Sequence, residues 1–232
     1  EVTKRKDNGF FDLEKDQEAL KVYLEEIHDK MISFDDEIER LHYLVDNNFY
    51  FNVFEKYSEA ELIEITEYAK SIHFQFASYM SASKFYKDYA LKTNDKTKFL
   101  EDYNQHVAIV ALYLANGNVK QAKQFISAMV EQRYQPATPT FLNAGRARRG
   151  ELVSCFLLEV DDSLNSINFI DSTAKQLSKI GGGVAINLSK LRARGEAIKG
   201  IKGVAKGVLP VAKALEGGFS YADQLGQRPG AG

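Results

Sequence analysis

A strand–helix–strand pattern between residues 152 and 188 constrains the fold more than any other feature of the sequence. Leu152–Leu158 is a short apolar run of the kind that forms a buried strand. Asp161–Ser163 then supplies capping side chains for a helix. The apolar stripe of that helix is formed by Ile167, Ile170, Ala174 and Leu177. Gly181–Gly183 ends the helix, and Val184–Leu188 is typical of a second strand. Because a helical crossover joins parallel strands, the pattern predicts a βαβ unit in a parallel sheet.

The preceding segment predicts helices instead. Apolar stripes at helical spacing recur there, for example at Ile38, Leu41, Leu44 and Val45 and at Val107, Val110, Ala111 and Leu114. Ser58 with Glu61 makes a capping box. Gly117 is placed to end one helix, and Asn118 to cap the next.

The change of character falls at two closely spaced prolines, Pro136 and Pro139. Proline biases the chain toward extended structure and ends a helical run. We therefore divide the chain into a helical N-terminal region, residues 1–134, and an α/β region, residues 135–232. A further helix is expected over residues 204–225, with Pro210 near its first turns.

Composition places the chain among ordinary globular proteins, since 44% of its residues are hydrophobic and 27% are charged. No apolar run approaches the roughly 18 residues of a membrane helix, and the charged N-terminus is not a secretory signal. A single cysteine cannot form an internal disulfide, which fits a cytoplasmic protein. The loop-like run at residues 226–232 leads us to expect that the natural chain continues past Gly232.

Charge and glycine are distributed unevenly. Residues 1–162 hold 20 Lys and Arg against 28 Asp and Glu, a balance of −8, whereas residues 163–232 hold 10 against 4, a balance of +6. Of the 16 glycines, 12 lie between Gly181 and Gly232. A basic, glycine-rich segment suits close approach of backbone to phosphate. A solvated basic face with flexible loops would explain the same composition.

Cys155 is the first candidate for chemistry. A lone cysteine in a strand is most often a small buried hydrophobe. Here it follows a cationic run, Arg146, Arg148 and Arg149, and nearby cations favour the reactive thiolate. A hydrolytic cysteine needs a histidine base, and every histidine lies in the helical segment. These are His28, His42, His73 and His106, whose spacing also argues against a metal site.

Phosphate binding is the second candidate. Asp162 and Ser163 open a helix, where an N-cap role would explain them, although helix N-termini also bind anions. Glycines and cations then alternate from Arg192 to Gly207, but neither the Walker pattern nor GxGxxG occurs in the chain. Aromatic residues are sparse among these cations, which disfavours a nucleic-acid groove.

Several strings together resemble the large, catalytic (alpha) subunit of class Ib ribonucleotide reductases. They are ATPTFLNAG (137–145), RRGELVSCFLLEVDDSLNSI (148–167), GGGVAINLSKLRARGE (181–196) and YADQLGQRPGAG (221–232), with YALKTND (89–95) in the helical region. The resemblance implies an α/β fold in which a helical segment precedes the first βα units of a ten-stranded α/β barrel, incomplete in this chain. It implies reduction of ribonucleoside diphosphates to deoxyribonucleoside diphosphates by radical chemistry.

The resemblance also assigns catalytic and substrate-binding positions. Cys155 corresponds to the barrel cysteine that is oxidised to a disulfide as the 2′ carbon of the ribose is reduced. Thr138, Ser154, Cys155 and Gly183 match positions that hold the substrate nucleotide. The partner cysteine, the thiyl-radical cysteine and the residues beside them cannot be assigned, since Cys155 is the only cysteine. The 232 residues alone are therefore expected to be inactive.

An allosteric specificity site is implied as well. Asp162, Ser163 and Leu164 match its start, and Arg192 and Lys199 match its phosphate contacts. Its effectors would be a deoxynucleoside triphosphate or ATP. Residues 199–207 and 222–232 resemble the two loops through which effector identity reaches the substrate site. A complete ATP-cone domain would not fit ahead of the helical segment, so overall activity control is not expected.

The partners implied are a radical-generating beta subunit that holds the metallocofactor and a glutaredoxin- or thioredoxin-like reductant. A homodimer is implied too, with the helices at 163–180 and 204–225 as candidate contacts. No cofactor or metal is expected in this chain, and neither nucleic acid nor membrane is an expected partner. Two rival functions stay open: a non-catalytic nucleotide-binding or dimerisation module with a structural Cys155, and a thiol-based phosphate-binding enzyme.

Overall fold

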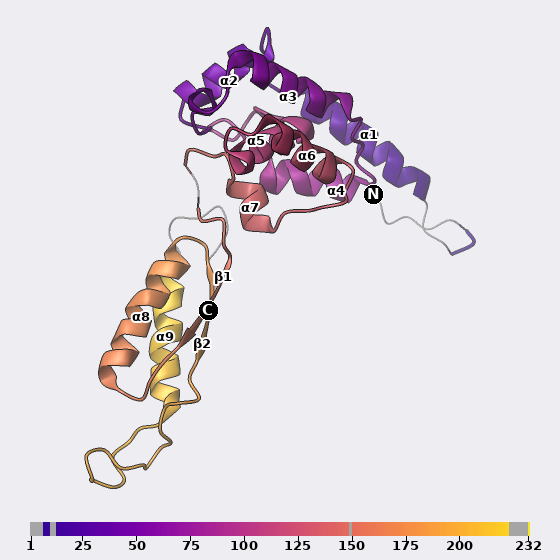
Figure 1. The fold of residues 1–232 in the computed structure, drawn as a ribbon. Helices are drawn as coiled ribbons and strands as arrows, with labels where there is room; N and C mark the ends of the chain where they lie inside the picture. Colours follow the sequence, from indigo (N-terminus) through magenta and orange to yellow (C-terminus); the bar gives the residue numbers. More distant parts are fainter. Residues whose placement is uncertain (1–6, 10–12, 149, 223–231) are drawn as a thin grey trace. The chain divides into compact units, whose positions relative to one another are not determined.

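The computed structural model describes residues 7–9, 13–148, 150–222 and 232 (Figure 1). Internal contacts divide the chain into two compact units. The first, which we call the helical unit, comprises Glu1–Ala137 and Ala144–Arg148. The second, the βα unit, comprises Thr138–Asn143 and Arg149–Gly232. The chain thus passes from the helical unit into the βα unit, returns briefly, and leaves again.

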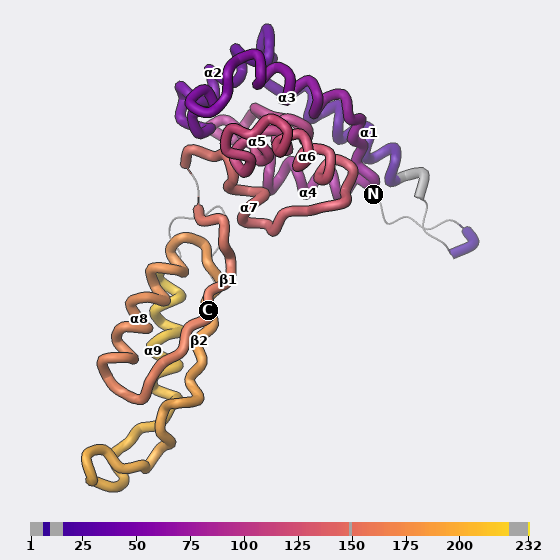
Figure 2. The backbone as a smooth tube through the Cα atoms, in the orientation of Figure 1, coloured from indigo at the N-terminus to yellow at the C-terminus, as the bar shows by residue number. Residues whose placement is uncertain are grey.

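The helical unit is built around one helix that is buried on nearly all sides. Its elements are α1 (Leu13–Asp29), α2 (Glu37–Asp46), the short 3₁₀ turn η1 (Val53–Glu55), α3 (Glu59–Ser71), α4 (Tyr79–Lys84), the π-helical turn η2 (Phe85–Tyr89), α5 (Tyr103–Ala115) and α6 (Val119–Val130). Residues Val107–Leu112 of α5 are all buried. Helices α3 and α6 pack against α5, and α1 packs against α4 (Figure 2). A helix that is apolar all round belongs in the centre of a core.

The helix ends follow local side-chain chemistry. The predicted capping box at Ser58 and Glu61 is confirmed, with Glu61 N donating to Ser58 Oγ and Ser58 N donating to Glu61 Oε2. Asn118 caps α6 as predicted, accepting from Gln121 N at 3.0 Å. Helix α5 ends on Asn116 in the left-handed region (φ 45°), and Gly117 follows with φ 95°. The predicted glycine stop therefore acts together with an asparagine.

A charged cluster lies inside this apolar unit. Glu101 and His106 have no exposed surface, and Arg146 is 5% exposed. Glu101 accepts hydrogen bonds from Arg146, from Tyr50 and from His106 Nδ1, the last at 2.8 Å. Nothing in the local sequence pattern predicts this cluster, because its members are up to 96 positions apart in the chain. Buried charges require such complete pairing to be tolerated.

The βα unit contains α7 (Thr138–Asn143), β1 (Cys155–Glu159), α8 (Leu164–Lys179), β2 (Gly183–Asn187) and α9 (Val208–Ala222). The two strands pair in parallel, with Cys155 opposite Gly183 and Glu159 opposite Asn187. The predicted helical region followed by a parallel βα unit is confirmed. Helix α8 packs on the strand pair, and α9 packs on α8.

The strand pair is covered on one face. Phe156 and Leu158 are half-buried, whereas Cys155, Leu157 and Glu159 are exposed on the other face, Leu157 to 83%. Gly182 allows the end of α8 to approach Phe156 closely, because a Cβ at this position would lie 2.5 Å from the Phe156 ring and 2.8 Å from the Leu177 carbonyl oxygen. The face that carries Cys155 is thus free of helices among the described residues.

Three sequence predictions differ from the structure. Residues after Pro136 do not stay extended but form α7, since a proline such as Pro139 is tolerated in the first turn of a helix. The first strand begins at Cys155 rather than Leu152. The last helix begins at Val208 rather than at 204, because residues 203–205 are held by backbone bonds to Gly195 and Glu196.

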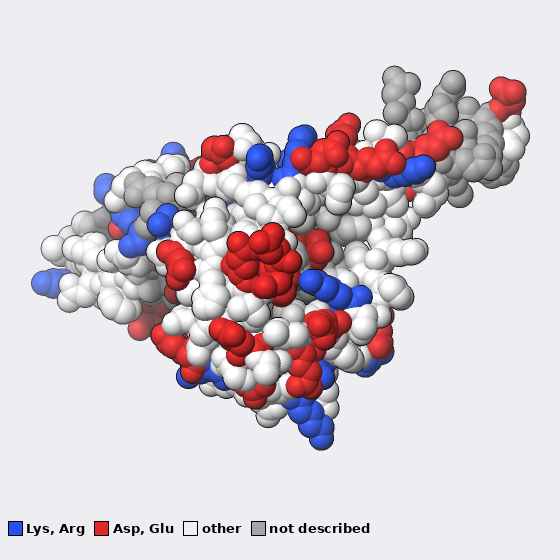
Figure 3. Space-filling model, turned by 90° about the horizontal axis from the view of Figure 1, so that it is seen from above, with Lys and Arg blue, Asp and Glu red and all other residues white. Residues whose placement is uncertain are grey.

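Surface charge reflects the composition. Asp and Glu side chains gather on the face shown in Figure 3. Among the described residues, no helix is both long and apolar enough to cross a membrane.

Candidate functional site

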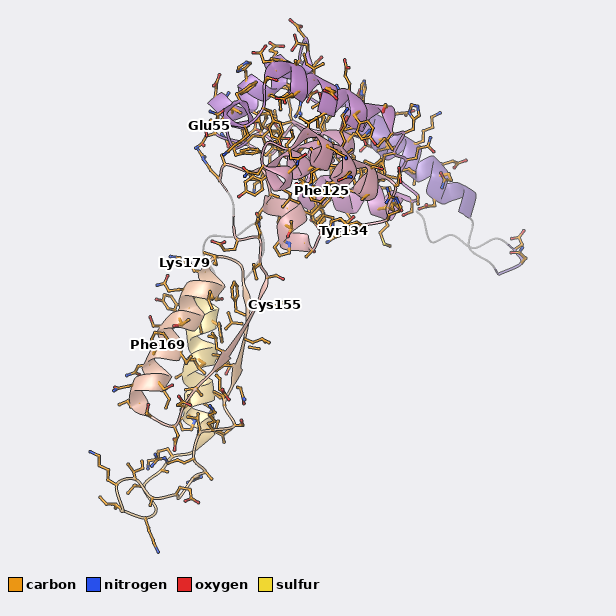
Figure 4. All side chains as sticks on the ribbon, viewed as in Figure 1. Glu55, Phe125, Tyr134, Cys155, Phe169 and Lys179 are labelled. Carbon is orange, nitrogen blue, oxygen red and sulfur yellow. The ribbon has the colours of Figure 1, made fainter. Side chains whose placement is uncertain are left out.

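The cysteine site lies where the two parallel strands begin. Cys155 is exposed, so the interpretation as buried packing is wrong (Figure 4). Gly183 N donates to the carbonyl oxygen of Ser154 at 2.6 Å, and Ser154 Oγ lies 3.5 Å from Cys155 Sγ. The structure therefore brings Ser154, Cys155 and Gly183 together at one end of the strand pair.

Glycines make this close arrangement possible. Gly181 has φ 83° where α8 ends, a conformation that side chains disfavour. A Cβ on Gly183 would lie 3.3 Å from the Ser154 carbonyl oxygen. The sequence predicts that these glycines end the helix. The structure adds a second reason, the close approach of this turn to the strand that carries Cys155.

Helix α7 is tied to the chain that leads into Cys155. Thr140 Oγ1 donates to the Leu152 carbonyl oxygen at 3.2 Å, and Asn143 Nδ2 donates to the Glu151 carbonyl oxygen at 3.0 Å. Thr138 is the exposed first residue of this helix. The bonds link α7, and hence the neighbourhood of Thr138, to the residues just before β1.

Arg146 does not serve the cysteine in the way the cationic run suggested. Its guanidinium is buried in the helical unit and bonded to Glu101. Arg148 is exposed, and Arg149 lies outside the described residues. The expectation that Arg146 would favour the Cys155 thiolate is therefore not supported.

Four of the five predicted effector residues, all except Lys199, meet at the start of α8. Ser163 caps this helix by accepting from Ser166 N at 3.1 Å. Asp162 accepts from Arg192 Nε at 2.6 Å, and Arg192 Nη1 donates to the Ala197 carbonyl oxygen at 2.7 Å. Leu164 is 71% exposed beside them. Arg192 thus bridges the helix start and the loop that follows β2.

A groove of about 850 Å³ opens next to Arg192. It is lined by Leu188, Ser189, Leu191, Arg192, Ala193, Arg194, Lys206, Gly207, Val208, Leu209 and Pro210. Three cations and an apolar wall in one groove suit an anionic ligand with an apolar portion. Lys199 lies instead in a tight turn between Ile198 and Ile201, with positive φ at both Lys199 and Gly200. The structure therefore joins Arg192 to Asp162 and places Lys199 at the tip of a small hairpin.

In the described part of the chain, no three His, Cys, Asp or Glu side chains gather as metal ligands would.

Comparisons with known proteins cover the whole sequence. Residues 1–74 match the ribonucleotide reductase N-terminal family, residues 75–149 the all-alpha domain, and residues 153–232 the barrel domain. This chain belongs to the ribonucleotide reductases. The resemblance stated from the sequence strings is confirmed.

Relatives extend well beyond the matched segment. The chain is 53% identical, over its entire length, to a ribonucleoside-diphosphate reductase subunit alpha of Bacillus subtilis (strain 168), of which it covers 33%. Identity is 45% over 95% of the chain with the subunit alpha of Mycoplasma pneumoniae, of which 31% is covered. The chain thus spans about a third of these ribonucleotide reductase relatives.

A solved structure supports the fold. The Actinobacillus ureae class Id ribonucleotide reductase alpha subunit superposes with a TM-score of 0.54 at 22% identity, covering 67% of this chain and 27% of that one. The match to the ribonucleotide reductase barrel domain begins at residue 153, two positions before β1. The parallel strand pair is therefore the barrel portion of this chain.

Proposed function

We propose that these residues are part of a class Ib-type ribonucleotide reductase alpha subunit, which reduces ribonucleoside diphosphates to deoxyribonucleoside diphosphates. The observation that carries the proposal is the 53% identity, along the whole chain, to a relative named ribonucleoside-diphosphate reductase subunit alpha. Cytoplasmic location belongs to the proposal, as the single cysteine indicated.

The proposed chemistry needs two thiols. The ribose 2′ hydroxyl leaves as water, the carbon gains hydrogen, and two cysteines are oxidised to one disulfide, so two electrons pass from sulfur to substrate. Cys155 would supply one thiol, and its exposure on the helix-free face of β1 fits this role. The second must come from outside these 232 residues, which contain no other cysteine. A glutaredoxin- or thioredoxin-like protein would then restore the thiols.

The exposed face of the strands fits the inside of a barrel. In α/β barrels the helices form an outer ring and side chains of the opposite strand face fill the interior. Parallel strands are ordinarily covered on both faces. The exposure of Leu157 beside Cys155 is what strands of an uncompleted barrel would show. Cys155 would then face the reaction space.

Substrate binding is assigned to Thr138, Ser154 and Gly183 together with Cys155. The 2.6 Å bond between Gly183 N and the Ser154 carbonyl oxygen supports this, because it sets the two beside the thiol. A Cβ at position 183 would be in tight contact with the Ser154 carbonyl oxygen, which favours glycine there.

The effector site is assigned to Asp162, Ser163, Leu164, Arg192 and Lys199. A deoxynucleoside triphosphate or ATP brings several negative charges, which the basic balance of residues 163–232 would offset. The groove beside Arg192 offers the cations and the apolar wall. Residues 199–207 and 222–232 would carry effector identity to the substrate. Residues 223–231 of the second loop lie outside the described residues.

The partners proposed are a beta subunit that holds the radical metallocofactor and a second copy of the alpha subunit. Helices α8 and α9 are the proposed dimer contact. Both expose large apolar side chains, of which Phe169 is 69% and Leu209 71% exposed. Apolar surface of this kind marks interaction sites.

The catalytic part is tested by Cys155→Ser in a full-length alpha subunit that carries this sequence, supplied with its beta subunit and reductant. Multiple-turnover reduction of cytidine diphosphate should fall to background, because serine cannot form the disulfide. Thermal stability and effector affinity should remain those of the wild type. Undiminished turnover would remove Cys155 from the reaction.

The effector part is tested by calorimetry with dTTP. Asp162→Ala and Arg192→Ala should each weaken binding by about tenfold or more, since a charge-assisted contact is removed. Arg133→Ala, at an exposed arginine of the helical unit, is the matched control. If both variants bind dTTP with wild-type affinity, Asp162 and Arg192 do not belong to the dTTP-binding surface.

A further inference from the structure

The loop between β2 and α9 folds back on itself, so that its two arms lie side by side (Figure 1). Gly195 N donates to the Ala205 carbonyl oxygen at 3.0 Å, and Ala205 N donates to the Glu196 carbonyl oxygen at 3.2 Å. Gly203 N donates to the Gly195 carbonyl oxygen at 2.9 Å. We call residues 194–207 the groove hairpin. Its own backbone bonds hold the two arms together.

The two arms meet once more at Gly207. A Cβ on Gly207 would lie 3.0 Å from Arg194 N and 3.1 Å from Arg194 Cβ. Gly207 has φ 79°, in the left-handed region that favours glycine. Lys206 stands between this close approach and the bonds at Ala205, so its backbone lies next to that of Arg194. The groove hairpin therefore brings two cationic residues of opposite arms together.

These two cations differ from the others of the βα unit. Arg194 and Lys206 are both exposed. Among the described residues of this unit, the cations that form ion pairs are others, namely Lys175, Lys190 and Arg192. Like charges held opposite one another on paired backbone segments repel. Such an arrangement becomes favourable when an anion binds between the two cations.

The same two residues line the groove of about 850 Å³ described above. Lys202 belongs to the groove hairpin too, but it is not among the lining residues. Helix α9 begins at Val208, and the free backbone amides of its first turn add partial positive charge. Positive charge in the groove is therefore concentrated around Arg194, Lys206 and the start of α9.

We propose that Arg194 and Lys206 form the subsite that binds the terminal phosphates of a nucleotide in this groove. The inference rests on the proposed function, which places an effector in this region but assigns neither residue to it. Arg192 is already bonded to Asp162 and to the Ala197 carbonyl oxygen. Arg194 and Lys206 can instead engage phosphate without losing a contact, and charge-assisted bonds to phosphate are strong. The subsite thereby selects a triphosphate over a monophosphate.

The test uses a full-length alpha subunit that carries this sequence. Arg194→Met, Lys206→Met and the double variant remove the charges and keep long apolar side chains. Lys202→Met is the matched control, because it removes the same charge from the same hairpin outside the groove. Calorimetry measures the dissociation constants of dTTP, dTMP and inorganic triphosphate, and the melting temperature reports on folding.

We expect each single variant to raise the dissociation constant of dTTP about tenfold or more, and the double variant to raise it further, because charge-assisted contacts to phosphate are lost. The affinity for dTMP should stay at the wild-type value, since dTMP lacks the two terminal phosphates. Inorganic triphosphate should bind the wild type and lose affinity in the double variant. Lys202→Met should behave as the wild type.

Three results would overturn the proposal. The first is wild-type affinity for dTTP in the double variant. The second is an equal loss of dTTP and dTMP affinity, which a general disturbance of the groove would cause. The third is a loss in Lys202→Met as large as in Lys206→Met, which would point to the charge of the whole hairpin.

A second pair of variants changes the spacing of the two cations and keeps their charges. Gly207→Ala places a methyl group 3.0 Å from Arg194 N and strains a left-handed backbone. Gly203→Ala imposes the same kind of strain, at φ 81°, with no atom within 4 Å. We expect weaker dTTP binding in Gly207→Ala than in Gly203→Ala. Equal affinities would contradict a subsite built on the approach of Gly207 to Arg194.

Failure of the proposed function gives a different result. If dTTP binds through Arg194 and Lys206 but does not change which ribonucleoside diphosphate is reduced, the effector role fails and the subsite stands. If the wild type binds inorganic triphosphate but not dTTP, the effector role fails, and the affinity of the double variant for inorganic triphosphate decides the subsite. A wild-type protein that binds neither overturns both.

Discussion

Glu101 is a carboxylate with no exposed surface, held ionised by its neighbours. Burial by itself would raise the pKa of Glu101, but Arg146 and His106 outweigh it and hold that pKa well below its usual range. The same surroundings raise the pKa of Tyr50, through burial and the negative charge of Glu101. At neutral pH the cluster therefore keeps a charged glutamate and a protonated tyrosine.

Glu101→Gln should make the stability of the protein less dependent on acid pH. The pKa of Glu101 in the folded state lies below its unfolded value of about 4.3, so its contribution is full above that pH and is lost as the pH falls toward the folded pKa. Stability at pH 7 should drop by about 3 kcal/mol or more, because Arg146 loses its partner. The difference from wild type should shrink by up to about 1.4 kcal/mol per pH unit below about pH 4.3.

Urea unfolding at a series of pH values measures this difference. Glu67→Gln, at an exposed position of α3, controls for the loss of one negative charge. A constant gap between wild type and Glu101→Gln from pH 7 to pH 3 would show that Glu101 is not the titrating group.

At the scale of the element, the start of α8 combines a helix cap with residues of the proposed effector site. Its first residues are Leu164 and Asn165, and the Ser163 side chain caps it. Asp162, one position earlier, is committed to Arg192. Ser163 therefore caps the helix, while the adjacent Asp162 makes the contact to Arg192. Substitutions at the two positions can test capping and ligand binding separately.

Ser163→Ala should lower the free energy of unfolding by about 1 kcal/mol, because the amide of Ser166 loses its acceptor. Ser163→Asn is the matched control, since asparagine caps helices as well as serine does. Chemical denaturation of both variants measures the effect. Equal losses in the two variants would mean that the hydroxyl is needed for something other than capping.

At the scale of the whole molecule, the two units differ in how they bury apolar side chains. The helical unit has a closed core centred on α5. The βα unit leaves a strand face and several apolar side chains uncovered. The proposed dimer contact, on α8 and α9, is therefore assigned to the βα unit.

Phe169→Glu should weaken association of two alpha subunits. Phe169 is 69% exposed on α8, and a charge there would be buried at the proposed dimer contact without a partner. Met80→Glu, at a 77% exposed methionine of α4, is the control. Sedimentation over a range of concentrations should show a dimer dissociation constant at least about tenfold higher for Phe169→Glu alone. An unchanged dimer would exclude the outer face of α8 as the contact.

Much of the fold follows from local sequence. Caps at Ser58 and Asn118, and the apolar run that holds Cys155, act over a few residues, so their spacing alone predicts helices and strands. The element limits near Pro139 and at Val208 were missed because contacts from other segments decide them. The strings around Cys155 were enough to indicate the family.

Local patterns in the sequence predict the order of elements and the residue types of the site, because capping, periodicity and turn chemistry act over a few residues. The packing of the chain sets the rest: Cys155 is exposed beside Gly183, Asp162 is paired with Arg192, and Arg146 is paired with Glu101 rather than with the thiol. These are contacts between segments 28 to 45 positions apart. Burial and charge pairing between such segments depend on how the chain packs, which no local pattern encodes.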